Sequence, residues 1–106
     1  MQFSTTHEIP GKTIKENLGI VAGNVVQSKH VGRDFMANLK SIVGGEIVGY
    51  TEMLADARDV AIERMVSEAH ARDADAIINV RFTTSAIMAS ASEILAYGTA
   101  VKLVEK

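Results

Sequence analysis

The chain has 106 residues, a net charge of −2 and no cysteine, with 47% hydrophobic and 23% charged residues. This length fits a single domain, residues 1–106, with little room for a separate catalytic lobe. The composition is that of an ordinary soluble globular protein. The absence of cysteine excludes disulfides, thiolate catalysis and cysteine-based zinc or iron–sulfur sites.

Charge and aromatic content argue against nucleic-acid and membrane partners. The excess acid lies after residue 45, and a chain without tryptophan that has only two tyrosines and three phenylalanines offers few rings for stacking bases. No apolar run approaches the roughly 18 residues of a membrane-spanning helix, and the first residues lack the layout of a secretory signal. We therefore expect a cytoplasmic protein that binds neither nucleic acid nor a membrane.

The first third of the chain predicts strands. Gln2–Thr5 can form a short strand, and a turn at Pro10-Gly11 leads into a longer strand over Ile14–Ser28. One face of that strand carries larger apolar residues: Ile14, Leu18, Ile20, Ala22 and Val26. On the other face, Gly19 and Gly23 lack side chains and would let another element approach the backbone closely.

Two helices are predicted next. Asp34–Val43 places its apolar residues on one stripe of a short helix, with Asp34 at the positive end of the dipole and Gly44 available as a C-cap. A longer helix is predicted from about Thr51 to Arg72, because this segment is rich in strong helix formers.

The last third predicts two further strands, Ala76–Thr84 and Ser92–Val104, joined by a hairpin loop in the stretch SAIMASA. One face of the last strand is small, with Ala96, Gly98 and Ala100, so the long helix should pack over it. The expected fold is a two-layer α+β domain in which one short and one long helix cover an antiparallel sheet.

The long helix carries more apolar surface than one sheet can cover. Its polar stripe is narrow and consists of Glu52, Asp56, Asp59, Glu63, Ser67 and His70. Apolar residues and alanine occupy roughly 240° of its circumference, whereas packing on one sheet requires an arc of about 100°. A second copy of the chain is the expected partner, because closed symmetric homo-oligomers are the common outcome.

The glycine-rich stretch IVGGEIVGY, residues 42–50, raises the question of a phosphate-binding loop. The Walker pattern requires a lysine and a hydroxyl residue after its last glycine, whereas Gly49 is followed by Tyr50 and Thr51. The dinucleotide pattern is absent as well, and Glu46 would repel a phosphate. We interpret the stretch as a corner between two helices, with glycines that supply backbone freedom.

Metal ligands are present, but their spacing is not that of a site. The stripe of Glu52, Asp56, Asp59 and Glu63 could hold a hard cation such as calcium, magnesium or manganese, and it also matches any solvated helix face. The three histidines, His7, His30 and His70, lie on different elements and none has the spacing of a helical zinc pair. Only the axis of an oligomer could gather copies of one histidine.

Nucleophilic catalysis finds no support, because there is no G-x-S-x-G motif and Ser28-Lys29-His30 has no visible acid partner. Arg33 and Asp34 form a polar pair next to Phe35, which a salt bridge or a helix cap explains and which could alternatively clamp a ligand. The sequence therefore assigns no catalytic, cofactor-binding or metal-binding residue.

Several segments together resemble the YbjQ-like family, a set of small bacterial proteins of unassigned function to which heavy-metal binding has been ascribed. The segments are QFSTT (2–6), TIKENLGIVAG (13–23), RDFMANLKSIVGGE (33–46), ARDVAIERM (57–65), DAII (75–78) and GTAVK (98–102). The resemblance implies helices packed on an antiparallel sheet and assembly as a ring-like homopentamer.

This chain departs from the family pattern at the end of the long helix. The family usually has a glycine in a G-A-D-A run, whereas this chain has Asp73 in ARDADA, so an aspartate must adopt the capping conformation. The lack of cysteine also weakens the metal assignment.

Three functions stay open from the sequence. The first is a non-enzymatic, self-assembling module that binds a small ligand or a divalent ion. The second is a structural or partner-docking protein without a ligand, and the third is an enzyme whose site lies between subunits.

Overall fold

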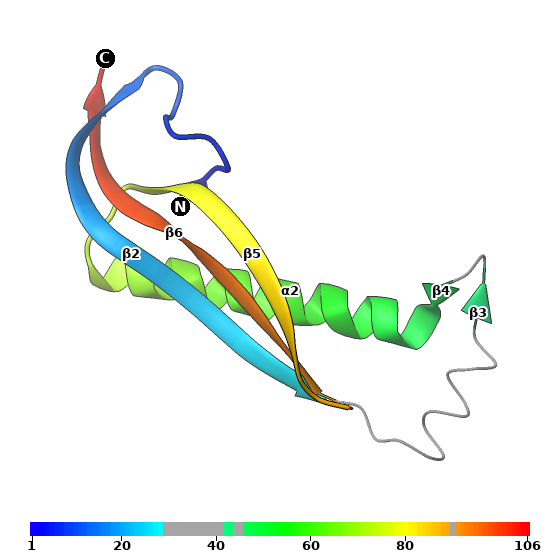
Figure 1. Ribbon diagram of the computed structural model, residues 1–106. Helices are drawn as coiled ribbons and strands as arrows, with labels where there is room; N and C mark the ends of the chain where they lie inside the picture. Colours follow the sequence, from blue (N-terminus) through cyan, green and yellow to red (C-terminus); the bar gives the residue numbers. More distant parts are fainter. Residues whose placement is uncertain (29–41, 44–45, 90) are drawn as a thin grey trace.

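The computed structural model describes residues 1–28, 42–43, 46–89 and 91–106, and it has an α+β architecture. Along the chain the elements are β1 (Gln2–Phe3), β2 (Lys12–Ser28), β3 (Ile42–Val43), β4 (Glu46–Ile47), α2 (Val48–Ala71), β5 (Ala76–Met88) and β6 (Ala91–Glu105). A strongly curved sheet crosses one side of the long helix α2 (Figure 1). No helix in the described ranges is both long and apolar enough to span a membrane.

The main sheet has the strand order β1-β5-β6-β2. The long strands pair antiparallel, but β1 runs parallel to β5, so the sheet is mixed and the prediction of a purely antiparallel sheet is wrong in this detail. Strands β1 and β2 lie at opposite edges of this sheet, so the chain between them crosses the sheet instead of forming an antiparallel hairpin. Buried Ile9 lies in this crossing and packs against Ala76, Ile78 and Val101.

The β5–β6 hairpin extends further than its sequence predicts. Strand pairing continues through Ser85↔Glu93 and Ala86↔Ser92, so most of the stretch SAIMASA is strand rather than loop. Pairing satisfies the backbone groups of these residues although their side chains are exposed. The predicted turn at Pro10-Gly11 is confirmed: the Lys12 N–H donates to the Ile9 carbonyl (3.1 Å), and Gly11 has φ of 78°.

The long helix α2 packs mainly on β2 and β6, and its bounds lie close to the predicted ones. Its buried row has the i, i+4 spacing of one helix face: Ala57, Ala61, Met65 and Ala69. Ala96 and Ala100 share that core, which confirms the predicted packing over the small face of β6. Gly98 lies on the same face, but its nearest neighbours are Ile77 and Val80 of β5 rather than the helix.

Gly23 of β2 is the point of closest approach between the helix and the sheet. A Cβ atom built on Gly23 would lie 2.2 Å from the Ala61 carbonyl oxygen and 2.4 Å from the Met65 nitrogen, both backbone atoms of α2. The sequence-based expectation that a glycine in this strand admits another element is therefore confirmed. Since backbone cannot move aside as a side chain can, this contact fixes where α2 lies.

Polar side chains of α2 cover the middle of the outer edge of β2. The row is Arg64, Glu68 and Arg72, spaced one helical turn apart, and we call it the capping row. Arg64 donates to the Asn24 carbonyl (2.7 Å) and Arg72 donates to the Leu18 carbonyl (3.0 Å). Glu68 accepts from the Ala22 N–H (3.1 Å). Backbone groups that would otherwise face solvent are thereby paired.

The N-terminal segment covers the first part of the outer edge of β5. The Ser4 N–H donates to the Ile77 carbonyl, and the N–H groups of Asn79 and Val80 donate to the carbonyls of Thr6 and Ser4, each at 2.9 Å. Asn79 has φ of 53° at a bulge of β5. Arg81 closes this covered stretch, because its Nη1 donates to the Thr5 carbonyl (2.9 Å).

The helix ends in a Schellman motif built around Asp73. The Ala74 N–H donates to the Ala69 carbonyl (3.1 Å), and the Asp73 N–H donates to the His70 carbonyl (3.0 Å). Asp73 has φ of 60°, in the left-handed region that glycine adopts without strain. The expectation that an aspartate makes this cap is confirmed.

The Asp73 carboxylate is paired with Lys102 of β6, whose Nζ lies 2.8 Å from Oδ2. The hydrogen bond that Lys102 donates and its positive charge lower the pKa of Asp73, and the same hydrogen bond raises the pKa of Lys102. The Asp73 side chain is almost fully exposed and that of Lys102 is partly exposed, so solvent screens the pair and it adds little to stability.

Two predictions around the glycine-rich stretch need correction. The short helix over Asp34–Val43 falls mostly on residues 29–41, which lie outside the described residues, and its end is wrong because Ile42–Val43 is strand β3. The predicted helix–helix corner is instead a two-residue connection between β3 and β4, which pair antiparallel. Isoleucine and valine favour strand at these positions, and α2 begins directly after β4.

We predict that Gly23→Ala destabilises the fold by at least about 3 kcal/mol, because the new methyl group would overlap the backbone of α2. Chemical denaturation followed by circular dichroism measures this loss. Gly11→Ala is the control: nothing lies within 4 Å of its Cβ position, so only its positive φ is strained. Equal losses in the two variants would contradict the proposed close contact.

We predict that Asp73→Gly raises the melting temperature by about 2–6 °C, since it removes left-handed strain and loses only an exposed ion pair. Asp73→Ala keeps the strain, loses the pair and should melt below the wild type. Calorimetry at pH 7 measures both shifts, and a lower melting temperature for Asp73→Gly would contradict the strain.

The same variants have a defined pH dependence. Because the pKa of folded Asp73 is lowered, the pair stabilises the native state above the ordinary carboxyl pKa, and this contribution is lost as the pH falls through the lowered value. The raised pKa of Lys102 makes the contribution disappear again as the pH rises through it. The deficit of Asp73→Ala should therefore shrink in acid.

Candidate functional site

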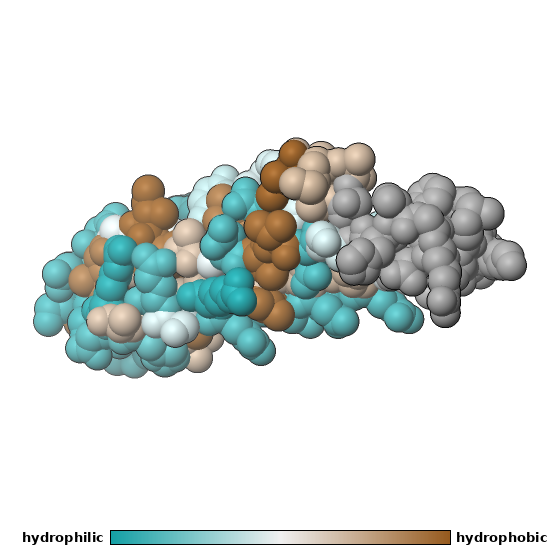
Figure 2. Space-filling view, turned by 90° about the horizontal axis from the view of Figure 1, so that it is seen from below, coloured by the Kyte–Doolittle hydropathy of each residue, from teal (hydrophilic) through white to brown (hydrophobic). Residues whose placement is uncertain are grey.

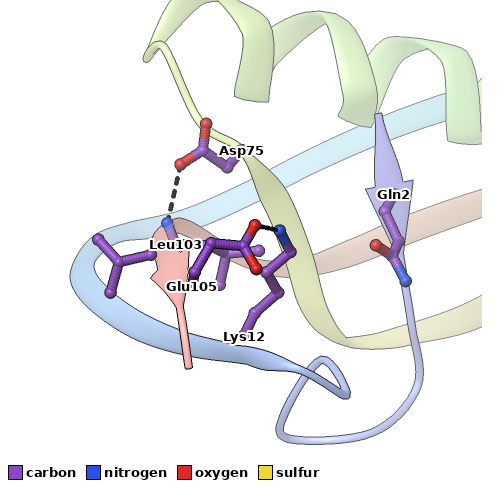
Figure 3. Close-up of a pocket in the computed structure, with 6 residues that line it drawn as sticks. Gln2, Lys12, Asp75, Leu103 and Glu105 are labelled. Carbon is purple, nitrogen blue, oxygen red and sulfur yellow. Dashed lines mark hydrogen bonds and ion pairs between the residues drawn. The ribbon is translucent and has the colours of Figure 1, made fainter.

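A charged cleft lies at the end of the sheet where the termini meet (Figure 3). It has a volume of about 500 Å³, is open to solvent, and is lined by Gln2, Lys12, Asp75, Leu103, Val104 and Glu105. These residues come from the start of β1, the start of β2, the turn after α2 and the end of β6. Antiparallel pairing of β2 with β6 places Lys12 directly opposite Glu105.

The charges of this cleft are already paired. Lys12 Nζ forms an ion pair with Glu105 Oε1, and Asp75 Oδ2 accepts a hydrogen bond from the Leu103 N–H (2.8 Å). Figure 3 shows both interactions facing the same opening. The cleft can offer hydrogen-bond donors and acceptors to a small polar molecule, but it contains no nucleophile held by a base.

A second hollow of about 370 Å³ adjoins the cleft and shares Lys12 with it. Its other lining residues are His7, Glu8, Thr13, Ile14 and Lys106. His7 Nε2 lies 3.9 Å from Glu8 Oε1, and both side chains are largely exposed. This hollow therefore adds exposed charges to the same end of the molecule rather than an enclosed pocket.

The structure does not bring the sequence-based candidates together. The acidic residues Glu52, Asp56, Asp59 and Glu63 lie on the exposed face of α2. No group of three or more histidine, aspartate or glutamate side chains suited to a metal ion occurs in the described part of the chain. His7 and His70 lie on different elements, whereas Lys29, His30, Arg33 and Asp34 fall outside the described residues.

Sequence reasoning missed the cleft residues Lys12, Asp75 and Glu105. Each lies at or next to the end of a strand, where a charged residue is normally interpreted as a solvent-exposed side chain without a specific role. The available signal was the position of Lys12 just before the first apolar alternation and of Glu105 just after the last. Only the pairing of β2 with β6 shows that these two ends meet.

Large exposed apolar side chains gather on the sheet rather than on the helix. They are Met1, Phe3, Ile14, Ile20, Val26, Leu54, Phe82, Ile87, Met88, Tyr97 and Val104. Among the described side chains of α2, Leu54 is 36% exposed, whereas Ile20 of β2 is 71% exposed and Met88 of β5 is 65% exposed. On the face seen in Figure 2, apolar side chains lie in small groups among hydrophilic ones. The large exposed apolar side chains described are thus mostly on the strands, whereas the sequence predicted the excess apolar surface on the long helix.

Comparison with known proteins identifies relatives over the whole chain. A family model described as "Putative heavy-metal-binding" matches residues 1–104. UPF0145 proteins of Shewanella frigidimarina, Vibrio parahaemolyticus and Thermotoga maritima are 68%, 67% and 58% identical to this chain. These alignments cover 97%, 99% and 97% of this chain and 96%, 100% and 97% of the relatives.

A solved structure shares the fold. It is the crystal structure of a protein of unknown function from Pediococcus pentosaceus, described as a member of the DUF74 family, with a TM-score of 0.70 and 17% sequence identity. The alignment covers 98% of both chains. At this identity the likeness shows the fold alone.

The heavy metal in the family description finds no evident set of ligands among the described residues of one chain. Heavy metals favour thiolate ligands, and this sequence has no cysteine. The histidine and carboxylate side chains of the described ranges form no cluster that could replace them. The family assignment does not depend on whether a metal binds. The family match over residues 1–104 and a relative of 68% identity show that the chain belongs to the YbjQ-like family.

Proposed function

We propose that this protein is a non-enzymatic module that works as a homo-oligomer, with the ring-like homopentamer that the family resemblance implies. The observation that carries the proposal is the apolar surface left exposed on the sheet, which includes Ile20, Phe82, Ile87 and Met88. These side chains lie on both faces of the sheet, since Ile20 is opposite Thr99 and Phe82 is opposite Ala96. Large exposed apolar surface is uncommon on monomers and is characteristic of protein interfaces.

The dimensions of the chain support assembly. Its radius of gyration is 17.3 Å, whereas a compact domain of this length has about 13 Å. Its accessible surface of 6743 Å² exceeds the value for a compact monomer of this size by roughly 1,000 Å². A standard interface removes about 800 Å² from each partner, so the excess is of the size that one neighbour covers.

The charged cleft supports a binding role over an enzymatic one. Lys12 and Glu105 in the cleft pair with each other, and the cleft is open to solvent. The two described groups with a shifted pKa, Asp73 and Lys102, form no part of its lining. A catalytic group usually has a perturbed pKa inside a pocket that excludes water.

A small ligand or ion is part of the proposal only in the assembled protein. No described cluster holds a metal within one chain, so residues from two or more copies would have to complete such a site. Nucleic acid and membranes have no part in the proposed function, and the cytoplasmic location stays a prediction.

We predict that the untagged protein has a mass in solution that is a multiple of the chain mass, with five copies as the expected number. Light scattering after size exclusion, at protein concentrations from about 1 to 100 μM, measures it. Because the exposed apolar surface drives association, the mass should persist at the lowest concentration. A stable single chain across this range would overturn the proposal.

Native mass spectrometry of the same sample tests the ligand separately. A molecule or ion that co-purifies adds a defined mass to the oligomer, and elemental analysis identifies a metal. An oligomer without added mass, together with no thermal shift on adding divalent ions, would leave assembly standing and remove the ion.

A further inference from the structure

The described strands leave one long edge uncovered. The capping row covers the middle of β2, and charged residues protect the start of that strand. The N-terminal segment covers β5 as far as Val80. Beyond Arg81, the segment Phe82–Met88 pairs with β6 on one side and with no described strand on the other. We call Phe82–Met88 the open edge.

Apart from a register irregularity between Ala86 and Met88, the open edge lacks the features that protect a free strand. Its sequence, FTTSAIM, contains no charged residue and no proline, and each of its residues is exposed. Natural proteins shield such edges with charges, prolines or a covering element, because an unprotected edge pairs with other chains. The other long edge, that of β2, is shielded by charges at its start and by the capping row as far as Asn24, so the longer unshielded stretch on β5 points to a specific partner.

A second feature of the fold pairs with no other strand of the described ranges. Strands β3 and β4 have two residues each and form a sheet of their own, separate from the main sheet. They lie at the N-terminal end of α2, at the opposite end of the molecule from the charged cleft (Figure 1). An isolated two-stranded ladder is at best marginally stable in water. Three of its four residues, Ile42, Val43 and Ile47, are β-branched and favour strands.

We propose that the β3–β4 ladder of one copy adds to the open edge of the next copy and extends its main sheet. The inference rests on the proposed self-assembly and specifies how it occurs. Each feature supplies what the other lacks: the ladder gains strands to pair with, and the open edge gains a covering strand.

The geometry of the contact determines the type of assembly. The ladder and the open edge are different surfaces of the chain, so each copy uses one of them toward each neighbour. Such head-to-tail contacts generate rings when the rotation closes. A pairing of two open edges with each other would instead give a two-fold dimer and leave β3 and β4 uncovered.

Single cysteine residues test the proposal directly, because the natural chain has none. One set of variants carries the thiol on the open edge, as Thr83→Cys, Thr84→Cys or Ser85→Cys. The other variant is Val43→Cys on β3. Each edge variant is refolded in a mixture with Val43→Cys and oxidised, and the covalent dimer is measured on a denaturing gel. Separate chains carry the two thiols, so only contacts between copies are detected.

We expect at least one edge variant to form a mixed disulfide with Val43→Cys at ten or more times the yield given by Ile20→Cys. Ile20 is the matched control, since it is more exposed than most apolar residues but lies on the strand that the capping row covers. Dominant dimers of an edge variant with itself would overturn the inference in favour of a two-fold pairing.

A charge on the open edge gives an independent measurement. Thr84→Lys should raise the concentration at which the oligomer dissociates at least tenfold, because a charge within a new strand pair is desolvated. Thr13→Lys on β2 is the control, since that region is already charged. Circular dichroism checks that both variants fold.

The outcomes separate the two proposals. A wild-type chain that stays monomeric removes both the assembly and this contact. An oligomer that forms no disulfide between β3 and the open edge, and that tolerates Thr84→Lys, leaves the assembly standing and removes only the inference.

Discussion

The contact between the backbone of α2 and Gly23 of β2 determines the remaining arrangement. Because no side chain intervenes there, the helix lies close to β2 and away from β5. Its polar row then reaches the outer edge of β2, where Arg64, Glu68 and Arg72 pair with the backbone. Within the described residues, α2 contacts β5 little and the second half of β5 is exposed. The close approach at Gly23 thus brings the capping row to the edge of β2.

The two ends of the molecule have different chemistry as a result. At the end near the termini, the crossing from β1 to β2 covers the outer face with Ile9 and forms a cleft whose charges are paired. At the other end, the β5–β6 hairpin exposes apolar side chains and an uncharged strand edge. The first end is suited to small polar molecules in water, and the second to protein surface. This division is the physical basis for treating assembly as the primary role of the chain.

The family description names heavy-metal binding, but this chain has no cysteine and so lacks the ligand that soft metals prefer. A soft heavy metal would have to be bound by histidine and carboxylate side chains, and the described ones are dispersed over α2 and the termini. Assembly offers the physical route to a convergent set, because symmetry multiplies each side chain around an axis. The proposed oligomer would therefore be the setting in which the described side chains could converge on an ion.

Local pattern and glycine placement were sufficient to predict α2, the three long strands, the turn at Pro10-Gly11 and the close approach at Gly23. The strained cap at Asp73 was expected from the family resemblance. These features depend on side-chain periodicity and backbone freedom, which are encoded by neighbouring residues. The parallel pairing of β1, the meeting of Lys12 with Glu105 and the exposure of Phe82 to Met88 were decided by the tertiary structure. These features depend on which distant segments lie side by side and on how far α2 is displaced across the sheet. Local sequence patterns contain no information on either.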